Sequence, residues 1–302
     1  MDQFPILESK EFIFIIGAPR SGTTMLQIIL GSHPDVATTV ELSLFSRYLG
    51  PWFQTWSEEV ANIRDKGWNQ GLPFIMEEPE FMNFARLFLD RCYAKVAARK
   101  PGATHLLDKH PGYSKRVETM RRLLPKARFL HIIRDGRDTA LSMVSAQRKL
   151  GFGASTVTGA ARAWKTFVLA ARKASAFGPD YLEVRYEDLL ARGVEAYAEV
   201  LEFCRLPAKR AWIGETLAAN SFEKMRDRQA SADVRVKAPQ AHYRLGEPGG
   251  WRAEFGIRER IDFDKNAGDL LCELGYAERD WWIEQPLDRV RGWLHGVRHS
   301  AI

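Results

Sequence analysis

A short glycine-bearing loop near the N-terminus has the residues needed to bind an anion. Residues 17–24 read Gly-Ala-Pro-Arg-Ser-Gly-Thr-Thr, which matches the spacing of a Walker A loop except that Thr23 stands where lysine is usual. The backbone amides of such a loop and of the helix after it form a cradle for phosphate. Hydroxyls of Ser21, Thr23 and Thr24, with Arg20 as the cation, suit an anion that carries less charge than a triphosphate.

A second anion-binding element reads R-D-G-R-D at residues 134–138, directly after an apolar run. Arg134 is the first residue after that run, and Ser142 lies on the helix expected next. An arginine at the end of a strand can give a phosphate two donors. The alternative is structural, with Arg134 paired in the interior to Asp138 or Glu187.

A lysine, a histidine and a glutamate are candidates for acid–base chemistry. Asp108-Lys109-His110-Pro111 ends a third apolar run, and Glu41 follows the first helix. Lys109 and Arg20 are candidates for the cations that stabilise a leaving oxygen. Glu41 and His110 compete as the base, because a histidine titrates near neutrality unaided whereas a glutamate needs burial or a like charge to raise its pKa.

The elements that must position these residues alternate along the chain. Apolar runs predict strands at residues 12–16, 104–107, 128–133 and 181–184, and helical patterns occur at about 23–30, 58–66, 78–98, 113–124 and 155–177, with another from 138. This alternation predicts an α/β fold, a P-loop NTPase-like, mainly parallel sheet flanked by helices on both faces. Ligands bind at the carboxyl ends of such strands, and each polar cluster named above follows a strand.

Composition favours one soluble, cytoplasmic domain over residues 1–302, with a helical C-terminal segment at about 258–302. Net charge is 44 − 38 = +6, which suits an anionic ligand. Cys92, Cys204 and Cys272 lack the spacing of a zinc site or disulfide framework, and no carboxylate cluster suggests a metal. No signal peptide or transmembrane segment is expected, because the longest early apolar stretch is far shorter than a membrane span. A long loop is expected at about 231–250.

Taken in order, the motifs resemble those of sulfotransferases that use 3′-phosphoadenosine 5′-phosphosulfate (PAPS). The first loop resembles their 5′-phosphosulfate loop, in the arginine-bearing form of tyrosylprotein and bacterial sulfotransferases. The R-D-G-R-D element resembles their 3′-phosphate element. Residues 244–252, Arg-Leu-Gly-Glu-Pro-Gly-Gly-Trp-Arg, resemble the late R-K-G-x-x-G-x-W-K loop, with Leu245 and Arg252 departing from its lysines.

This resemblance implies an enzyme, an O-sulfotransferase that moves the sulfuryl group of PAPS onto a hydroxyl of a carbohydrate, lipid, peptide or small molecule. It implies in-line displacement with a general base, no metal and no nucleic-acid partner, and it is compatible with a homodimer. The implied catalytic residues are Arg20, Glu41, Lys109 and His110. The implied donor-binding residues are Arg20, Ser21, Gly22, Thr23, Thr24, Arg134, Ser142, Tyr186, Arg244 and Gly246. The spacing from Arg20 favours Glu41 as the base.

Two other classes of function remain open from the residues. One is a kinase or hydrolase on the same P-loop architecture, which Thr23 and Arg134 argue against because they replace the lysine and the metal-binding carboxylate. The other is a non-catalytic binder of adenosine bisphosphates or nucleic acid, which the net charge allows. The aromatic-rich region at 48–56, with Trp68, Phe74 and Phe81, either lines an acceptor pocket or belongs to the core.

Overall fold

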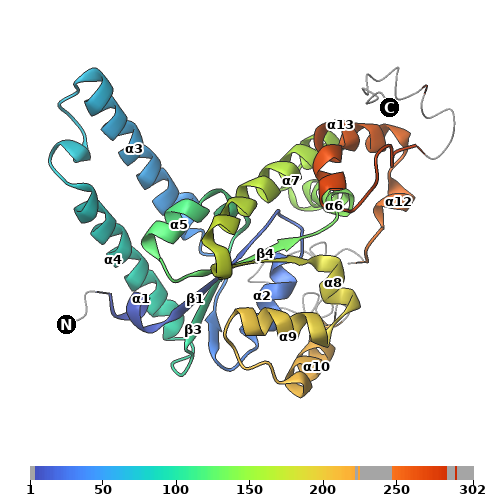
Figure 1. Ribbon diagram of the computed structural model, residues 1–302, viewed down its shortest axis with the longest axis horizontal. Coiled ribbons are helices and arrows are strands. Elements are labelled where there is room, and N and C mark those ends of the chain that lie inside the picture. Colours follow the sequence, from blue (N-terminus) through green and yellow to red (C-terminus); the bar gives the residue numbers. More distant parts are fainter. Residues whose placement is uncertain (1–3, 222–223, 225–246, 284–289, 291–302) are drawn as a thin grey trace.

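A parallel sheet is the centre of the molecule in the computed structural model, which describes residues 4–221, 224, 247–283 and 290 (Figure 1). Its strands are β1 (Glu11–Ile16), β2 (Val36–Thr38), β3 (His105–Lys109), β4 (Arg128–Ile133) and β5 (Tyr181–Arg185). The order is β2-β3-β1-β4-β5, and every pairing is parallel. Because β1 lies between β3 and β4, the polar segments after these three strands meet at one edge of the sheet.

The helices follow the strands in the order expected for an α/β fold. The longer ones are α2 (Thr23–Gly31), α3 (Leu49–Lys66), α4 (Glu78–Ala97), α6 (Gly136–Leu150), α7 (Val157–Arg172), α9 (Val194–Phe203), α10 (Arg210–Ala219) and α13 (Ile257–Glu273). The shorter ones are α1 (Pro5–Ser9), α5 (Val117–Leu123), α8 (Tyr186–Ala191) and α12 (Trp251–Glu254). A π-helical turn at Leu44–Tyr48 precedes α3, and 3₁₀ turns occur at Leu72–Phe74, Pro111–Lys115 and Lys173–Asp180.

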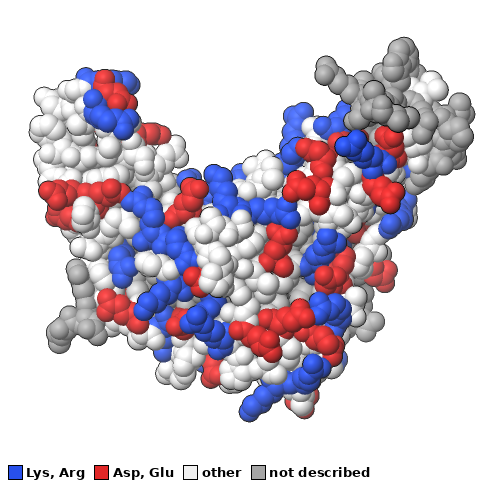
Figure 2. Space-filling view, in the orientation of Figure 1, with Lys and Arg blue, Asp and Glu red and all other residues white. Residues whose placement is uncertain are grey.

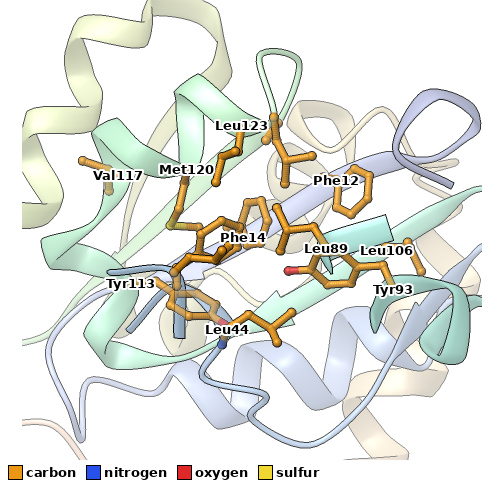
Figure 3. Close-up of a cluster of buried hydrophobic side chains, with 14 of the residues drawn as sticks. Phe12, Phe14, Leu44, Leu89, Tyr93, Leu106, Tyr113, Val117, Met120 and Leu123 are labelled. Atoms are coloured by element: carbon orange, nitrogen blue, oxygen red, sulfur yellow. The ribbon is translucent and has the colours of Figure 1, made fainter. Parts of the chain in front are cut away.

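Alternate side chains of β1 enter two different cores, one on each face of the sheet. Phe12, Phe14 and Ile16 pack with residues of α3, α4 and α5, and Figure 3 shows part of this cluster. Ile13 and Ile15 pack on the opposite face with residues of α2 and α9. A third cluster joins α6, α7 and α13. Burial on both faces explains why β1 reads as a continuous apolar run, and the predicted fold class is confirmed.

The helix predictions differ from the structure mainly at their ends. The helix expected from residue 113 begins at Val117, because the chain first makes the 3₁₀ turn that opens with Pro111. The helix expected to reach residue 177 ends at Arg172, and Gly178 beyond it has a positive φ of 58°. Helix α3 begins at Leu49, well before residue 58.

One strand was not predicted, and two predicted segments are described only in part. Strand β2 has only three residues, too few for an alternating pattern, and it was missed. Helix α13 accounts for the start of the predicted C-terminal helical segment, while residues 284–289 and 291–302 lie outside the described residues. Most of the loop expected at 231–250 also lies outside them. The single-domain organisation stays a prediction.

Helices α3 and α4 lie side by side and project from the body of the molecule (Figure 1). The space-filling view shows this face hollowed between that pair and the side formed by α7 and α13, with positive and negative side chains interspersed below (Figure 2). The aromatic region of the pair divides in two. Trp56 stacks on Phe81 with ring centroids 4.4 Å apart, and both are buried. Tyr48, Trp52, Trp68 and Phe74 are exposed.

Candidate active site

The glycine-bearing loop connects β1 to α2 through unusual backbone angles. Gly17, Arg20 and Gly22 have positive φ values of 148°, 72° and 97°. A Cβ atom at Gly17 would lie 2.4 Å from the carbonyl oxygen of Ile132 on β4, so that position accepts only glycine. The Ser114 hydroxyl receives the Gly17 N–H at 2.9 Å and donates to the Gly17 carbonyl at 3.2 Å. Sequence reasoning missed Ser114, which carries no local signal of this role.

Gly22 allows the loop to pack closely against the ring of Tyr186, which also contacts Arg134 at the end of β4. A Cβ atom at Gly22 would lie 2.5 Å from that ring. The Arg134 guanidinium stacks on the same ring, 4.5 Å from its centroid. Tyr186 is buried, and burial raises the pKa of its hydroxyl. Tyr186 therefore holds the loop and Arg134 in register by packing.

The two predicted anion-binding elements meet in space. The Arg20 Nε atom donates to the Ser142 hydroxyl at 3.1 Å, although 122 residues separate them in the chain. The Ser21 hydroxyl and the Arg134 Nε are buried, and neither has a hydrogen-bond partner within the part of the chain that the structure describes. A buried donor without a partner costs about 1–3 kcal/mol. An anion with phosphate-like oxygens would supply the missing acceptors, so the residues present fit such a group.

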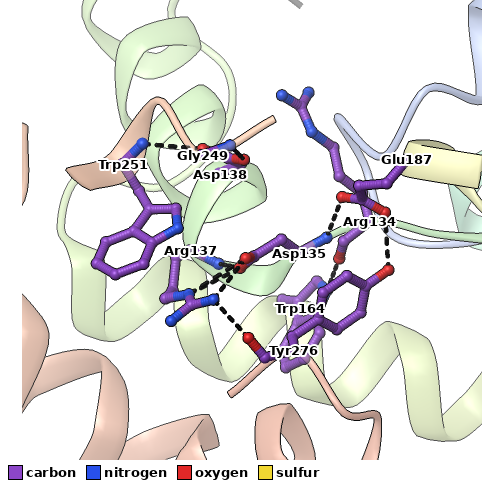
Figure 4. A network of polar contacts seen from close by, with 9 residues as sticks. All are labelled: Arg134, Asp135, Arg137, Asp138, Trp164, Glu187, Gly249, Trp251 and Tyr276. Atoms are coloured by element: carbon purple, nitrogen blue, oxygen red, sulfur yellow. Dashed lines mark hydrogen bonds and ion pairs between the residues drawn. The ribbon is translucent and has the colours of Figure 1, made fainter. Parts of the chain in front are cut away.

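A buried polar network holds the end of β4 and the start of α6 (Figure 4). Asp135 caps α6 by accepting the Arg137 N–H at 2.9 Å, and its carboxylate also forms an ion pair with the Arg137 guanidinium at 2.7 Å. The backbone N–H of Asp135 donates to Glu187 at 2.9 Å, and the Tyr276 hydroxyl donates to the other oxygen of Glu187 at 2.9 Å. Trp164 donates from its indole N–H to the Arg134 carbonyl at 3.1 Å. The backbone that carries Arg134 is therefore fixed from several sides.

Arg134 does not form the interior ion pair with Asp138 or Glu187 that was the structural alternative. Glu187 accepts from Asp135 and Tyr276 instead. Asp138 accepts the backbone N–H of Gly249 at 2.6 Å and that of Trp251 at 2.9 Å. No ion pair to Arg134 occurs among residues 4–221, 224, 247–283 and 290. Its guanidinium is therefore free of a protein carboxylate in the described structure.

The hydrogen bonds that Asp138 accepts hold residues 249–251, the end of the motif at 244–252, against the start of α6. Trp251 is buried, and the Arg137 guanidinium stacks between its ring and that of Trp281, at 3.9 and 4.7 Å from the two centroids. Trp251 is thus a packing anchor. Arg244 and Gly246, predicted to hold the 3′-phosphate, lie outside the described residues.

At the end of β3, the structure brings together Lys109, Glu41 and His110. Lys109 is buried, and its ammonium group donates to the Thr24 hydroxyl at 3.0 Å and to Oε1 of Glu41. The other Glu41 oxygen, Oε2, lies 3.8 Å from the Nε2 atom of His110. The Glu41 side chain is 41% exposed, so a solute can reach it. Lys109 thus links the loop to Glu41, one of the two candidates for the base.

Hydrogen bonding determines where His110 carries its proton. Its Nδ1 atom accepts the backbone N–H of Gly112 at 3.0 Å and lies 3.2 Å from the Ser46 hydroxyl. Because an amide can only donate, the neutral ring must carry its hydrogen on Nε2, the atom that faces Glu41. Burial lowers the pKa of His110; the charge of Glu41 opposes this shift, and Lys109 adds to it. The neutral ring therefore has its N–H on the side of Glu41.

The parallel sheet, the phosphate-type loop after β1 and the cations at the ends of β3 and β4 define a P-loop-like α/β fold. Consistent with this class, the profile of the sulfotransferase family matches residues 12–210. The chain belongs to the sulfotransferase family.

Several relatives with similar sequences are named protein-tyrosine sulfotransferases. The protein-tyrosine sulfotransferase of Drosophila melanogaster is 29% identical over 201 residues, which are 65% of this chain and 38% of that protein. Protein-tyrosine sulfotransferase A of Caenorhabditis elegans is 26% identical over 228 residues, 72% of this chain and 58% of that protein. The chain therefore spans less than two thirds of the length of these relatives.

Solved structures with the same fold include two sulfotransferases of low sequence identity. Mouse sulfotransferase SULT7A1, complexed with PAP, superposes with a TM-score of 0.55 at 15% identity, covering 91% of this chain and 94% of that one. The sulfotransferase domain of the Synechococcus PCC 7002 olefin synthase superposes with a TM-score of 0.52 at 18% identity, covering 89% and 96%. At these identities the likeness concerns the fold.

Neither a membrane-spanning helix nor a metal-ligating cluster occurs in the part of the chain that the structure describes. None of the helices in that part of the chain is both long and apolar enough to cross a bilayer. The same part of the chain holds no cluster of three or more histidine, cysteine or acidic side chains arranged to ligate a metal.

Proposed function

We propose that this chain transfers the sulfuryl group of PAPS to the hydroxyl of an acceptor. One observation carries the proposal, the contact between Arg20 and Ser142 that joins the two anion-binding elements. It places two anion-binding elements side by side, as a nucleotide with phosphates on both its 5′ and 3′ sides requires. Lys109 then connects the first element, through Thr24, to Glu41.

The donor is held in this proposal by both elements. Arg20, Ser21, Gly22, Thr23 and Thr24 bind its 5′ side through hydroxyls, the guanidinium and the free amides at the start of α2, where the Gly22 cap provides no side-chain acceptor. Arg134 and Ser142 bind the 3′-phosphate, and Tyr186 supports Arg134 from below. Roles for Arg244 and Gly246 stay predictions. PAPS supplies a sulfuryl group attached to a phosphate leaving group.

Glu41 takes the proton from the acceptor hydroxyl in this proposal. Its carboxylate is accessible from solvent, whereas the Nε2 atom of neutral His110 already carries a hydrogen that points toward Glu41. His110 therefore faces the carboxylate with an N–H group, 3.8 Å from Oε2. Lys109 is buried next to Thr24 and stabilises the negative charge that develops on the leaving oxygen, together with Arg20.

The acceptor is proposed as a hydroxyl compound, with the phenol of tyrosine as the first to test. The similar relatives from Drosophila melanogaster and Caenorhabditis elegans are named protein-tyrosine sulfotransferases. A tyrosine peptide, a sugar and an alkyl alcohol offered in parallel would separate the acceptor classes. A homodimer and a cytoplasmic location stay predictions.

Calorimetric titration with adenosine 3′,5′-bisphosphate, 5′-AMP and ATP–magnesium tests the proposal. We expect the bisphosphate to bind more tightly than either of the others, because only it engages both phosphate elements. Arg134→Ala should weaken its binding by about 100-fold or more, as expected for a lost charged pair to phosphate. Arg64→Ala is the matched control, because Arg64 lies on the exposed end of α3 and pairs only locally with Asp65.

Two results would replace the proposal with another class of function. Tighter binding of ATP–magnesium than of the bisphosphate would favour a P-loop kinase or hydrolase. Salt-dependent oligonucleotide binding without any release of PAP from PAPS in the presence of acceptors would favour a non-catalytic binder.

A further inference from the structure

A buried carboxylate lies directly behind the candidate catalytic residues. Asp108 precedes Lys109 on β3, so the two side chains point to opposite faces of the sheet. Lys109 reaches the loop and Glu41, whereas Asp108 enters the aromatic core and is only 2% exposed. Burying a carboxylate in such surroundings is costly unless its oxygens accept hydrogen bonds.

Hydrogen bonds from three donors reach this carboxylate. The Tyr93 hydroxyl donates to Oδ2 at 2.9 Å, and the Tyr113 hydroxyl donates to the same oxygen at 2.8 Å. The backbone N–H of Lys109 donates to Oδ1 at 2.8 Å. Asp108 therefore fixes the main chain of Lys109 and selects one orientation for each tyrosine hydroxyl. Both tyrosine rings lie in the cluster drawn in Figure 3.

The two tyrosines differ in what their hydroxyls do next. The Tyr113 oxygen accepts the backbone N–H of Leu44 at 3.0 Å. Leu44 begins the π-helical turn that follows the segment carrying Glu41, and Ser46 of this turn contacts Nδ1 of His110. The Tyr113 hydroxyl thus connects β3 to the segment that holds the candidate base, whereas the Tyr93 hydroxyl has Asp108 as its one partner among the described residues.

We propose that Asp108 is a positioning residue that holds Glu41 next to Lys109 and His110 through the Tyr113 hydroxyl and the Leu44 amide. The expected effect on turnover rests on the proposed function. The placement of Glu41 next to Lys109 and His110 does not depend on it. Lys109 and His110 follow Asp108 on one strand, and Glu41 lies on a separate segment. The hydrogen bonds through Tyr113 set the distance between this strand and the segment that carries Glu41.

The test compares Tyr113→Phe with Tyr93→Phe. Each change removes one hydroxyl from the same Asp108 oxygen, and both rings are almost fully buried, so the loss of stability that comes from the Asp108 contact should be similar. Only Tyr113→Phe also leaves the Leu44 amide without its acceptor. We expect Tyr113→Phe to slow single-turnover release of PAP from PAPS with a tyrosine peptide by about 10-fold, because misplacing a reacting group is costly. Affinity for adenosine 3′,5′-bisphosphate should stay within about 2-fold.

A second readout is independent of activity. NMR titration of the His110 ring reports the distance to Glu41, whose charge raises the pKa of this histidine. Tyr113→Phe should lower the pKa of His110 as Glu41 moves away, and Tyr93→Phe should leave it at the wild-type value. Equal titration of His110 in both variants and wild type, or an equal shift in both variants, overturns the proposal.

The outcomes separate this inference from the proposed function. If wild-type protein binds no adenosine bisphosphate, the proposed function fails, while the His110 comparison still decides whether Asp108 positions Glu41. If Tyr113→Phe does not fold, Asp108→Asn replaces it, with hydrogen exchange at the Leu44 amide as the readout. Asparagine can satisfy at most two of the three donors, because its NH₂ group must face either the two tyrosine hydroxyls or the Lys109 amide. Either arrangement disturbs the contact between β3 and Tyr113, so exchange at Leu44 should accelerate. Unchanged exchange there overturns the proposal.

Discussion

The ends of β3 and β4 face the same edge of the sheet on either side of β1, yet they are built differently. At the end of β4, Asp135 and Arg137 have side chains that are 10% and 4% exposed, and each is held by several partners. At the end of β3, the side chains of Glu41 and His110 are 41% and 20% exposed, and 3.8 Å separates them.

This difference matches the two tasks that the proposed reaction sets. The part of the donor that does not react needs a rigid receptor, and the mutually bonded Asp135, Arg137 and Glu187 provide one. The reacting part needs an opening for the acceptor and a base that solvent can reach. The molecule therefore combines a buried anchor at β4 with an open, charged site at β3.

Removing the cation from the β4 network should give the largest loss of stability. Arg137→Ala leaves Asp135 buried without its ion pair and removes the stacking on Trp251, so we expect a loss of about 3–5 kcal/mol in the free energy of unfolding. Urea denaturation measures it. Arg148→Ala, an exposed position on the same helix, should change little. Equal midpoints for the two variants would contradict a rigid anchor.

The free energy of unfolding should depend on pH through Asp108, the buried carboxyl near the end of β3. Burial raises the pKa of this carboxyl from 3.8 to about 6, although the tyrosine hydroxyls oppose the shift. Between these values the folded protein binds a proton that the unfolded chain has lost, so this contribution to stability is full below pH 4 and is lost as the pH rises through 6. The free energy of unfolding of wild type minus that of Asp108→Asn should fall by up to roughly 3 kcal/mol from pH 4 to 7.

Urea unfolding of both proteins at several pH values tests this sign, because the subtraction cancels the titration of all other groups. If the difference in the free energy of unfolding stays constant or rises with pH, the pKa of the Asp108 carboxyl is not raised.

Loss of the candidate base should affect turnover and spare donor binding. Glu41→Ala is expected to lower the turnover number by about 10²-fold or more, with the affinity for adenosine 3′,5′-bisphosphate nearly unchanged. Steady-state kinetics with the best hydroxyl acceptor, paired with calorimetry, measures both quantities. If Glu41→Ala turns over normally and His110→Ala does not, the histidine is the base.

The smallest of these effects is expected at the link between α6 and the late segment. Asp138→Asn keeps one acceptor oxygen for the amides of Gly249 and Trp251, which now share a carboxylate. We expect roughly 10-fold weaker binding of the bisphosphate, as for the loss of one charge-assisted hydrogen bond. Asp269→Asn, an exposed pair with Lys165, is the control. Unchanged affinity would mean that this segment does not support the donor site.

Much of the fold was predictable because its signals are local. The apolar runs gave correct positions for β1 and β4, since strands buried on both faces need uninterrupted apolar residues. The loop at residues 17–24 was recognisable because Gly17 and Gly22 occupy backbone conformations and close contacts that exclude larger residues. The fold class and the family follow from such segments and their order.

The tertiary structure alone decided how these segments act together. The sequence contains no sign that Ser114 holds Gly17 or that Arg20 meets Ser142, because each contact joins residues about a hundred positions apart. It left Glu41 and His110 open as bases, and the amide of Gly112 is what places the histidine proton on the side of Glu41. Residue types and spacing determine which groups can do chemistry. Only packing across the sheet determines which of them meet, and in which protonation state.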